Sequence, residues 1–286
     1  MTPNVQVARR LNEVADLLRD QGANSFRVQA YRRGAETVAR LERPVNEILE
    51  ADGLDALRQL PGIGDRLAIA IRDIVRLGRL PMLDRLRGES DPEELLKTVP
   101  GIGRIHARRL HEELGIDSLE DLEAAAHDGR LANLEGLGPK RLTAIQDSVA
   151  ARLGRIRTTD IPPLDEPSIE ELLDVDGEYR RRGDSGELHK IAPHRFNPQG
   201  HAWLPILHTQ RGERHYSAVF SNTAHAHKLG KTSDWVILYY DGRAGERQAT
   251  VITSQFGALK GRRIVRGREE ECFRYYGAGL RLAAGT

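Results

Sequence analysis

The stretch that decides the fold of this 286-residue chain is Leu57-Arg-Gln-Leu-Pro-Gly-Ile-Gly-Asp-Arg-Leu-Ala-Ile-Ala-Ile71. Apolar residues end one helix, Pro61-Gly-Ile-Gly64 makes a turn, and apolar residues resume at once on one face of a second helix. Glycine has no steric penalty at positive φ, so this turn can be tighter than other side chains allow. The amides after the turn then lie at a helix N-terminus, which is a ready site for phosphate.

The same pattern occurs twice more. Leu96-Lys-Thr-Val-Pro-Gly-Ile-Gly-Arg-Ile-His-Ala-Arg-Arg-Leu110 matches the apolar and glycine positions. Leu131-Ala-Asn-Leu-Glu-Gly-Leu-Gly-Pro-Lys-Arg-Leu-Thr-Ala-Ile145 matches them except that Leu142 replaces the small residue. Three copies in one apolar frame predict helix-hairpin-helix motifs that contact the nucleic-acid backbone and barely read base identity. The bulk of Leu142 favours a structural role for the third copy. The predicted DNA-binding residues are Gly62, Gly64, Arg66, Gly101, Gly103, Arg104, Arg108, Gly136, Gly138 and Lys140.

Composition bounds the class of protein. Apolar residues make up 39% of the chain, and it contains no run long enough for a transmembrane helix or a signal peptide. The single cysteine, Cys272, excludes an internal disulfide framework and predicts a reducing, cytoplasmic location. A net charge of +1 means that a DNA-binding surface must arise from segregated charges, and 5% aromatic residues disfavours a stacking platform for single strands.

The pattern changes character after residue 153. Helical periodicity gives way to the proline-rich segment 155–167, which we interpret as a linker, and then to strand-like segments. The predicted fold class is multidomain, with an all-α helix-hairpin-helix half followed by a small α+β domain. We place the domains at 1–88, 89–154 and 168–286, and the strands at 202–209, 215–221, 234–240, 248–253 and 262–265.

The helical half, over about residues 4–150, resembles the amino-terminal region of bacterial-type family X DNA polymerases. The resemblance rests on Asn24-Ser-Phe-Arg-Val-Gln-Ala-Tyr-Arg-Arg33, the first hairpin motif and the acidic run 112–125. It implies a lyase-type DNA-binding domain followed by a fingers-like domain, with a 5′-phosphate pocket at Arg27, Tyr31 and Arg66. Family members with lyase activity form a Schiff base through a lysine that aligns with Ala70, so the resemblance implies phosphate capture without that chemistry.

The polymerase palm has no clear counterpart. Family palms carry Arg-Arg-Gly shortly before Asp-x-Asp, whereas Asp174-Val-Asp176 here precedes Tyr179-Arg-Arg-Arg-Gly183. The pair falls at the end of a predicted helix, where carboxylates two residues apart diverge. We therefore expect a capping or solvated acidic pair in place of a magnesium site.

Two other features of the second half leave alternatives open. Its histidines show no metal-ligand spacing and favour backbone-bonded positions on β-hairpins over a zinc or hydrolytic site. The basic run 260–268 fits a solvated edge strand or an auxiliary phosphate contact equally well. The histidines are His189, His194, His201, His208, His215, His225 and His227.

The favoured hypothesis is a sequence-independent DNA-binding protein that acts on gapped, nicked or 5′-phosphate ends in DNA repair. It predicts no polymerase or Schiff-base lyase activity, no metal, no cofactor and no membrane association. A first alternative is a metal-dependent nuclease or phosphodiesterase that uses some of His201, His208, His215, Asp174 and Asp176. A second is a DNA-bound scaffold whose carboxy-terminal domain binds a protein partner.

Overall fold

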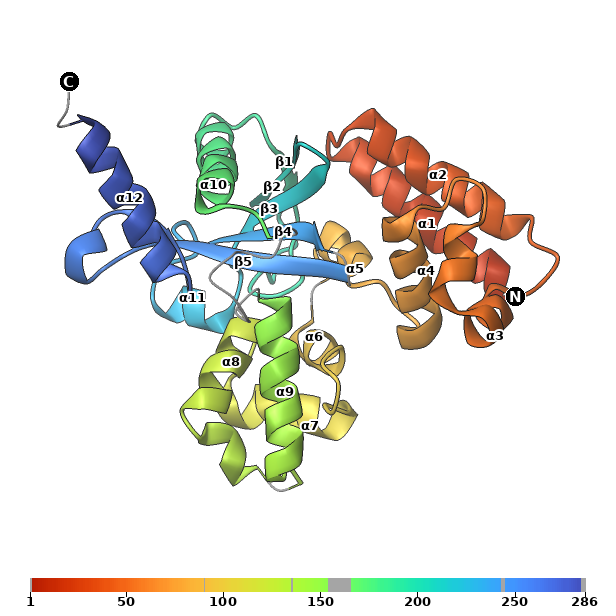
Figure 1. Ribbon diagram of the computed structural model, residues 1–286, viewed down its shortest axis with the longest axis horizontal. Coiled ribbons are helices and arrows are strands. Elements are labelled where there is room, and N and C mark those ends of the chain that lie inside the picture. The colour runs from red at the N-terminus through yellow and green to blue at the C-terminus, as the bar shows by residue number, and fades with distance from the viewer. Residues whose placement is uncertain (1, 90, 135, 154–165, 243–244, 284–286) are drawn as a thin grey trace. The chain divides into compact units, whose positions relative to one another are not determined.

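The computed structural model describes residues 2–89, 91–134, 136–153, 166–242 and 245–283 (Figure 1). The chain divides into two compact units. The first comprises Met1–Ser90, Leu188–Gln210 and Asp241–Gly245, and the second comprises Asp91–Glu187, Arg211–Tyr240 and Glu246–Thr286. The predicted linker lies outside the described residues except for 166 and 167, and the three-domain division of the sequence stays a prediction.

The first unit contains five helices among its described residues: α1 (Pro3–Asp20), α2 (Ser25–Ala39), α3 (Val45–Arg58), α4 (Asp65–Leu77) and α5 (Pro81–Arg87). Leu11, Val14 and Leu18 are fully buried on α1, as their three- and four-residue spacing predicts. Helix α2 begins where the side chain of Asn24 accepts a hydrogen bond from the amide of Phe26 (2.8 Å). Helix α3 continues to Arg58 across a kink at Gly53, which has φ +77°.

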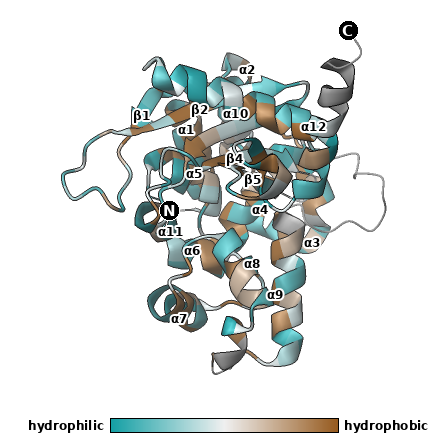
Figure 2. Ribbon diagram, turned by 90° about the vertical axis from the view of Figure 1, so that its left-hand side faces the viewer, coloured by the Kyte–Doolittle hydropathy of each residue, from teal (hydrophilic) through white to brown (hydrophobic). Residues whose placement is uncertain are grey.

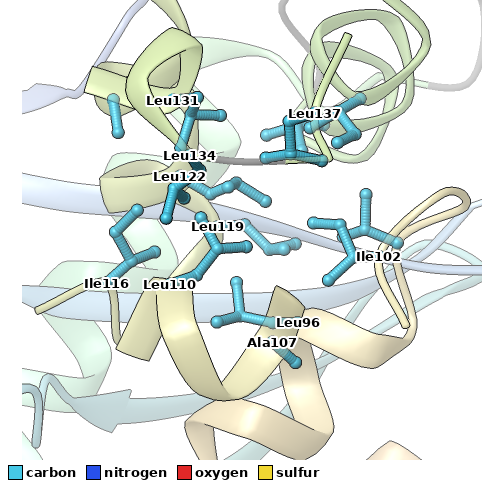
Figure 3. Close-up of a cluster of buried hydrophobic side chains, with 14 of the residues drawn as sticks. Leu96, Ile102, Ala107, Leu110, Ile116, Leu119, Leu122, Leu131, Leu134 and Leu137 are labelled. Carbon is cyan, nitrogen blue, oxygen red and sulfur yellow. The ribbon is translucent and has the colours of Figure 1, made fainter. Parts of the chain in front are cut away.

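The second unit opens with a helical group made of α6 (Pro92–Lys97), α7 (Arg104–Leu114), α8 (Leu119–His127), the 3₁₀ turn η1 (Arg130–Asn133) and α9 (Pro139–Arg152). Asp91 caps α6 through the amide of Glu94 (3.2 Å), and Ser118 caps α8 through the amide of Asp121 (3.1 Å). Apolar and polar residues alternate around these helices (Figure 2). Their apolar faces meet in one cluster, in which the labelled side chains point toward one another (Figure 3): Leu96, Ile102, Ala107, Leu110, Ile116, Leu119, Leu122, Leu131, Leu134 and Leu137.

The rest of the chain supplies strands and the helices that flank them. The strands are β1 (His189–Ile191), β2 (Leu204–Arg211), β3 (Arg214–Phe220), β4 (Val236–Gly242), β5 (Gly245–Thr253) and β6 (Arg263–Val265), and they form a six-stranded sheet in chain order. The pairs β1–β2, β3–β4 and β5–β6 are antiparallel. The other elements are α10 (Ile169–Asp184), α11 (Ala224–Lys228), η2 (Gly257–Leu259) and α12 (Glu269–Ala283).

This arrangement confirms the predicted fold class, a helical half followed by a small antiparallel sheet with helices. The five predicted strands each overlap an observed one, whereas the three-residue β1 was missed because it is too short to show alternation. Among the described residues, none of the helices is long and apolar enough to cross a membrane.

Candidate nucleic-acid interface

The first hairpin motif, here called hairpin 1 (residues 60–68), has the conformation that its glycines predict. Gly62 has φ +74°, Ile63 is buried, and the amide of Ile63 donates to the carbonyl of Leu60 (3.0 Å). Gly64 is the N-cap of α4, and the first bond inside that helix runs from Ala68 N to Gly64 O (2.9 Å). The amides of residues 65–67 precede this bond and point out of the helix N-terminus.

Hairpin 2 (residues 99–107) and the described residues of hairpin 3 (residues 134–142), which are 134 and 136–142, repeat this backbone. Gly101 and Gly136 both have φ +89°, and Ile102 and Leu137 are buried as Ile63 is. Leu142 is partly buried and packs against the apolar cluster of these helices, so its bulk does not distort hairpin 3. The hydrogen bonds recur one for one: Ile102 N to Val99 O (3.1 Å), Ala107 N to Gly103 O (2.9 Å), Leu137 N to Leu134 O (3.2 Å) and Leu142 N to Gly138 O (3.0 Å).

Hairpins 2 and 3 pack against each other reciprocally. A Cβ atom at Gly101 would lie 3.3 Å from Cγ of Arg141, and one at Gly136 would lie 2.9 Å from Nε2 of His106. Arg141 and His106 each lie three residues after the second glycine of their own motif, so equivalent positions face equivalent loops. This quasi-two-fold arrangement fixes the N-termini of α7 and α9 relative to each other.

The charges on hairpins 2 and 3, and at the next residue of α7, favour an anion. Arg104, Arg108 and Lys140 are exposed, and no described carboxylate lies within ion-pair distance of any of them. Arg109, on the same helix, is instead engaged by Glu113 (Nε to Oε1, 2.7 Å). Two helix N-termini with three such cations nearby form an arrangement suited to phosphate.

Hairpin 1 has the same backbone and different electrostatics. The first residue of α4 is Asp65, whose carboxylate lies at the helix N-terminus and receives Nε of Arg58 (2.7 Å). Nε of Arg66 lies 3.1 Å from the Oδ2 atom of Asp241. The protein therefore supplies hairpin 1 with anions of its own.

The predicted 5′-phosphate pocket is only partly assembled. Arg27 and Tyr31 come together one turn apart on α2, where both are more than 90% buried. The Nη2 atom of Arg27 and the hydroxyl of Tyr31 lie 3.7 and 3.4 Å from the sulfur of Met82. Arg66, the third predicted member, is exposed and bonded to Asp241.

A buried hydrogen-bonded contact between His208 and Gln21 lies in the first unit near Arg27. Nε2 of His208, on β2, lies 3.0 Å from Oε1 of Gln21, whose amide donates to the carbonyl of Leu86 (2.8 Å). Burial, and then the positive charges of Arg27 and Arg85, hold the pKa of His208 well below its usual range, so the ring is neutral near pH 7. Sequence patterns gave no signal for this group, because His208 and Gln21 are 187 residues apart.

The position that aligns with the lyase nucleophile is occupied by a methyl group. Ala70 is buried in α4. The two lysines before residue 160 lie elsewhere, since Lys97 is bonded to Glu94 at the end of α6 and Lys140 is on hairpin 3. Residues 2–89 therefore present no lysine amine.

The acidic pair on α10 is engaged by arginines of the sheet. Asp176 is buried and accepts two bonds from Arg263, through Nε (2.9 Å) and Nη2 (2.7 Å). Asp174 accepts a bond from Nε of Arg211 (2.7 Å). The two carboxylates thus diverge as predicted, but Asp176 is a buried ion-pair partner and not the capping or solvated group that we expected.

The carboxy-terminal histidines have separate surroundings. The ring of His225 lies against that of Trp235, with 5.3 Å between the ring centres, and Nε2 of His227 lies 2.6 Å from Oδ1 of Asn222. The amide of His201 donates to the side chain of Asn197 (3.0 Å). Within the described ranges, no three histidine, cysteine, aspartate or glutamate residues are grouped closely enough to hold a metal ion.

The basic run 260–268 divides into two kinds of residue. Arg263 is bonded to Asp176, and buried Arg268 donates to Glu271 (2.7 Å) and to the carbonyl of Pro167 (2.8 Å). Lys260 and Arg262, before the strand, are exposed. β6 lies at the edge of the sheet, so the edge-strand interpretation fits its place, and the exposed pair keeps the phosphate interpretation open.

Two buried acids in the acidic run 112–125 were missed as structural residues. The side chain of Asp117 accepts a bond from the amide of Ala224 at the start of α11 (2.8 Å). Glu120 accepts bonds from the Thr250 hydroxyl and from Nε2 of Gln248 (2.8 Å). In the sequence these acids look like ordinary helix-start residues, because their partners lie more than 100 residues away.

Comparison with known proteins agrees with the hairpin geometry. A family model described as a helix-hairpin-helix domain matches residues 2–80, and one described as a SAM-like helix-hairpin-helix tandem matches residues 93–150. The first match contains hairpin 1, and the second contains the reciprocal pair of hairpins 2 and 3. The predicted motifs are thereby confirmed.

Two curated relatives are similar over the amino-terminal half. The DNA polymerase/3'-5' exonuclease PolX of Bacillus subtilis (strain 168) is 29% identical over 136 residues, which are 47% of this chain and 23% of that protein. DNA polymerase lambda of Arabidopsis thaliana is 28% identical over 151 residues, 50% of this chain and 27% of that protein. The chain thus spans about a quarter of the length of these relatives, and its resemblance to the amino-terminal region of family X polymerases is confirmed.

Proposed function

We propose that this protein binds the DNA phosphate backbone through hairpins 2 and 3 and acts at gapped, nicked or 5′-phosphate ends during DNA repair. The helix-hairpin-helix matches and the similarity to two DNA polymerases support DNA binding. The observation that carries the proposal is the reciprocal packing of Gly101 and Gly136 against the opposite hairpin. It presents two helix N-termini as one unit, beside the exposed Arg104, Arg108 and Lys140.

This arrangement suits phosphates and not bases. Backbone amides and guanidinium groups donate to phosphate oxygens in the same way whatever base is attached, so contacts of this kind carry no sequence information. Binding to intact duplex is then on the order of 10⁻⁴ to 10⁻⁶ M near physiological salt, and it weakens as salt rises.

A preference for 5′-phosphate ends involves Arg66 in hairpin 1. Its guanidinium is bonded to Asp241 through Nε, so a terminal phosphate competes with that carboxylate. A dianionic phosphate carries more charge than one carboxylate and accepts bidentate bonds from arginine, which favours the exchange. In this proposal Arg27 and Tyr31 support α2 from the buried side and do not touch the phosphate.

The proposed role involves no Schiff-base step. Forming the adduct requires a lysine amine next to the bound sugar aldehyde, and the aligned position is Ala70. The protein therefore holds an incised abasic end without cutting it.

The test compares gapped duplexes that differ only in a 5′-phosphate or a 5′-hydroxyl, by fluorescence anisotropy. We expect tighter binding to the phosphate. Asp241→Asn should increase this preference, because it removes the carboxylate that competes with the phosphate for Arg66, and Arg66→Gln should abolish it. Equal affinity for both ends in the wild type and in Asp241→Asn would contradict the end preference.

Borohydride trapping on incised abasic DNA should give no covalent adduct. An adduct that disappears on substitution of Lys97 or Lys140 would show a displaced nucleophile.

A further inference from the structure

The low aromatic content disfavours an extended stacking platform, but the few aromatic residues of this chain are unevenly distributed. Of the 14 in the sequence, 12 follow residue 178, and only Phe26 and Tyr31 precede it. Several are exposed on the second unit, which argues for a use there other than core packing, because burying an aromatic side chain is favourable.

The most exposed of them lies in the loop that joins β5 to β6, here called the stacking loop (residues 254–262). Phe256 is 85% exposed, more than any other large hydrophobic residue in the described part of the chain. The loop is closed at its base by Ser254 N to Arg262 O (2.9 Å) and Gly261 N to Ser254 O (2.8 Å). The base of the loop is therefore fixed, while the phenyl ring of Phe256 at its tip is exposed to solvent. In Figure 1 the loop projects beside α12.

The loop that carries this ring is positively charged. The stacking loop contains no acidic residue, and Lys260 and Arg262 are both exposed. The Cζ atom of Arg262 lies 5.2 Å from the centre of the Tyr276 ring, whose hydroxyl donates to the carbonyl of Arg263 (2.7 Å). This stacking fixes the guanidinium in place, and Tyr276 is itself anchored to the start of β6.

Two of the three acidic residues that follow in the chain have basic partners. Glu270 lies 3.7 Å from Arg274, and Glu271 lies 2.7 Å from Arg268. Glu269, at the start of α12, accepts a bond from the amide of Gly267 (2.8 Å). The excess charge at the stacking loop is therefore positive.

We propose that the stacking loop and Tyr276 form a binding site for an unpaired DNA strand. One base stacks on Phe256, and the phosphates on either side contact Lys260 and Arg262. An aromatic face combined with cations that follow the backbone is the usual chemistry of single-strand binding, and it tolerates any sequence because every base has a π face. The inference rests on the proposed function only in taking DNA as the ligand: a gap presents an unpaired strand next to the duplex that hairpins 2 and 3 contact.

The experiment uses the full chain and two fluorescent probes, a single-stranded oligo(dT) and an intact duplex. Phe256→Ala should weaken oligo(dT) binding by about five- to 100-fold, the range found for stacking on aromatic side chains, and leave duplex binding unchanged. The double variant Lys260→Ala with Arg262→Ala should have a weaker salt dependence of oligo(dT) binding. The slope of log K against the logarithm of the salt concentration should become shallower by about 0.7 for each phosphate that the loop no longer neutralises. Because Phe256 is exposed, its replacement should not change the melting temperature.

Phe196→Ala is the matched control. Phe196 is also an exposed phenylalanine, at 46%, with an arginine beside its ring (Arg195, 4.9 Å), but it lies outside the stacking loop. It should leave oligo(dT) binding unchanged. An unaltered oligo(dT) affinity in Phe256→Ala, or an equal reduction on oligo(dT) and on duplex, would overturn the inference. A wild-type protein that does not bind duplex would instead count against the proposed function.

Discussion

Hairpin 1 and hairpin 2 share a sequence motif and a backbone, and they differ in what surrounds them. Each has a first glycine at positive φ, a buried isoleucine and a second glycine that caps a helix. At the first helical position hairpin 1 has Asp65, already bonded to Arg58, whereas hairpin 2 has the exposed Arg104. The motif therefore fixes a turn, and the flanking charges decide whether that turn attracts a phosphate.

The second difference is the partner of each loop. Nothing lies closer than 3.6 Å to a Cβ built at Gly62, where the neighbour is Arg33, while Gly101 faces α9 at 3.3 Å. Hairpin 2 is one half of a reciprocal pair, which lets two helix N-termini act together. We infer that hairpins 2 and 3 provide most of the duplex affinity and that hairpin 1 contributes mainly at 5′-phosphate ends.

The largest effect should come from reversing charge in the first turns of α7, which begins in hairpin 2. Arg104→Glu with Arg108→Glu should weaken duplex binding by about 100-fold, because two charge-assisted phosphate contacts become repulsive. Arg66→Glu on hairpin 1 should weaken it much less, since Arg66 is already bonded to Asp241. Anisotropy titrations at fixed salt measure both. A larger decrease in affinity from Arg66→Glu would reverse the comparison.

A smaller effect is expected from replacing the first glycine of hairpin 1 or hairpin 2, and it distinguishes a loss of stability from a loss of DNA binding. Gly101→Val and Gly62→Val each force a β-branched residue to positive φ, which should lower the free energy of unfolding by about 1–3 kcal/mol. Only Gly101→Val should also weaken duplex binding under conditions where both variants are folded. Urea unfolding measures the stability of each variant, and a separate titration of the folded variants with duplex DNA measures their affinity. Equal affinity of Gly101→Val and the wild type would remove hairpin 2 from the interface.

The smallest effect concerns the unit that contains hairpin 1. The folded-state pKa of His208 is lowered, so the unfolded chain binds the proton more readily and stability is lost as pH falls below about 6.5. His208→Gln keeps a donor for Gln21 and should flatten this dependence between pH 7 and 5, at a cost of about 1 kcal/mol at pH 7. Thermal melts across this range provide the measurement. The exposed His201→Gln is the control and should melt as the wild type does at every pH.

The hairpins could be predicted from the sequence, because Gly-x-Gly within an apolar frame is a local pattern whose geometry depends on neighbouring residues. Which charged residues of the hairpins are ion-paired could not be predicted. Asp241 lies 175 positions after Arg66, and only the tertiary fold brings the two together. The same holds for Asp117 and Glu120, whose buried bonds reach α11 and β5. Arg27 and Tyr31 align with a phosphate pocket, yet their burial depends on contacts that the local sequence does not encode.

The most direct test of the account places a carboxylate in each anion site. Gly64, Gly103 and Gly138 have open space around the position of a Cβ atom, and the first two have extended backbones at helix N-caps, where aspartate is a favoured residue. Each glycine-to-aspartate variant should therefore fold at least as stably as the wild type, with its carboxylate on the amides that would bind phosphate. Duplex affinity should fall about tenfold or more in Gly103→Asp and in Gly138→Asp, and should change by less than about twofold in Gly64→Asp. An unchanged affinity in folded Gly103→Asp, or an equal decrease in Gly64→Asp, would contradict the claim that hairpins 2 and 3 form the duplex-binding surface.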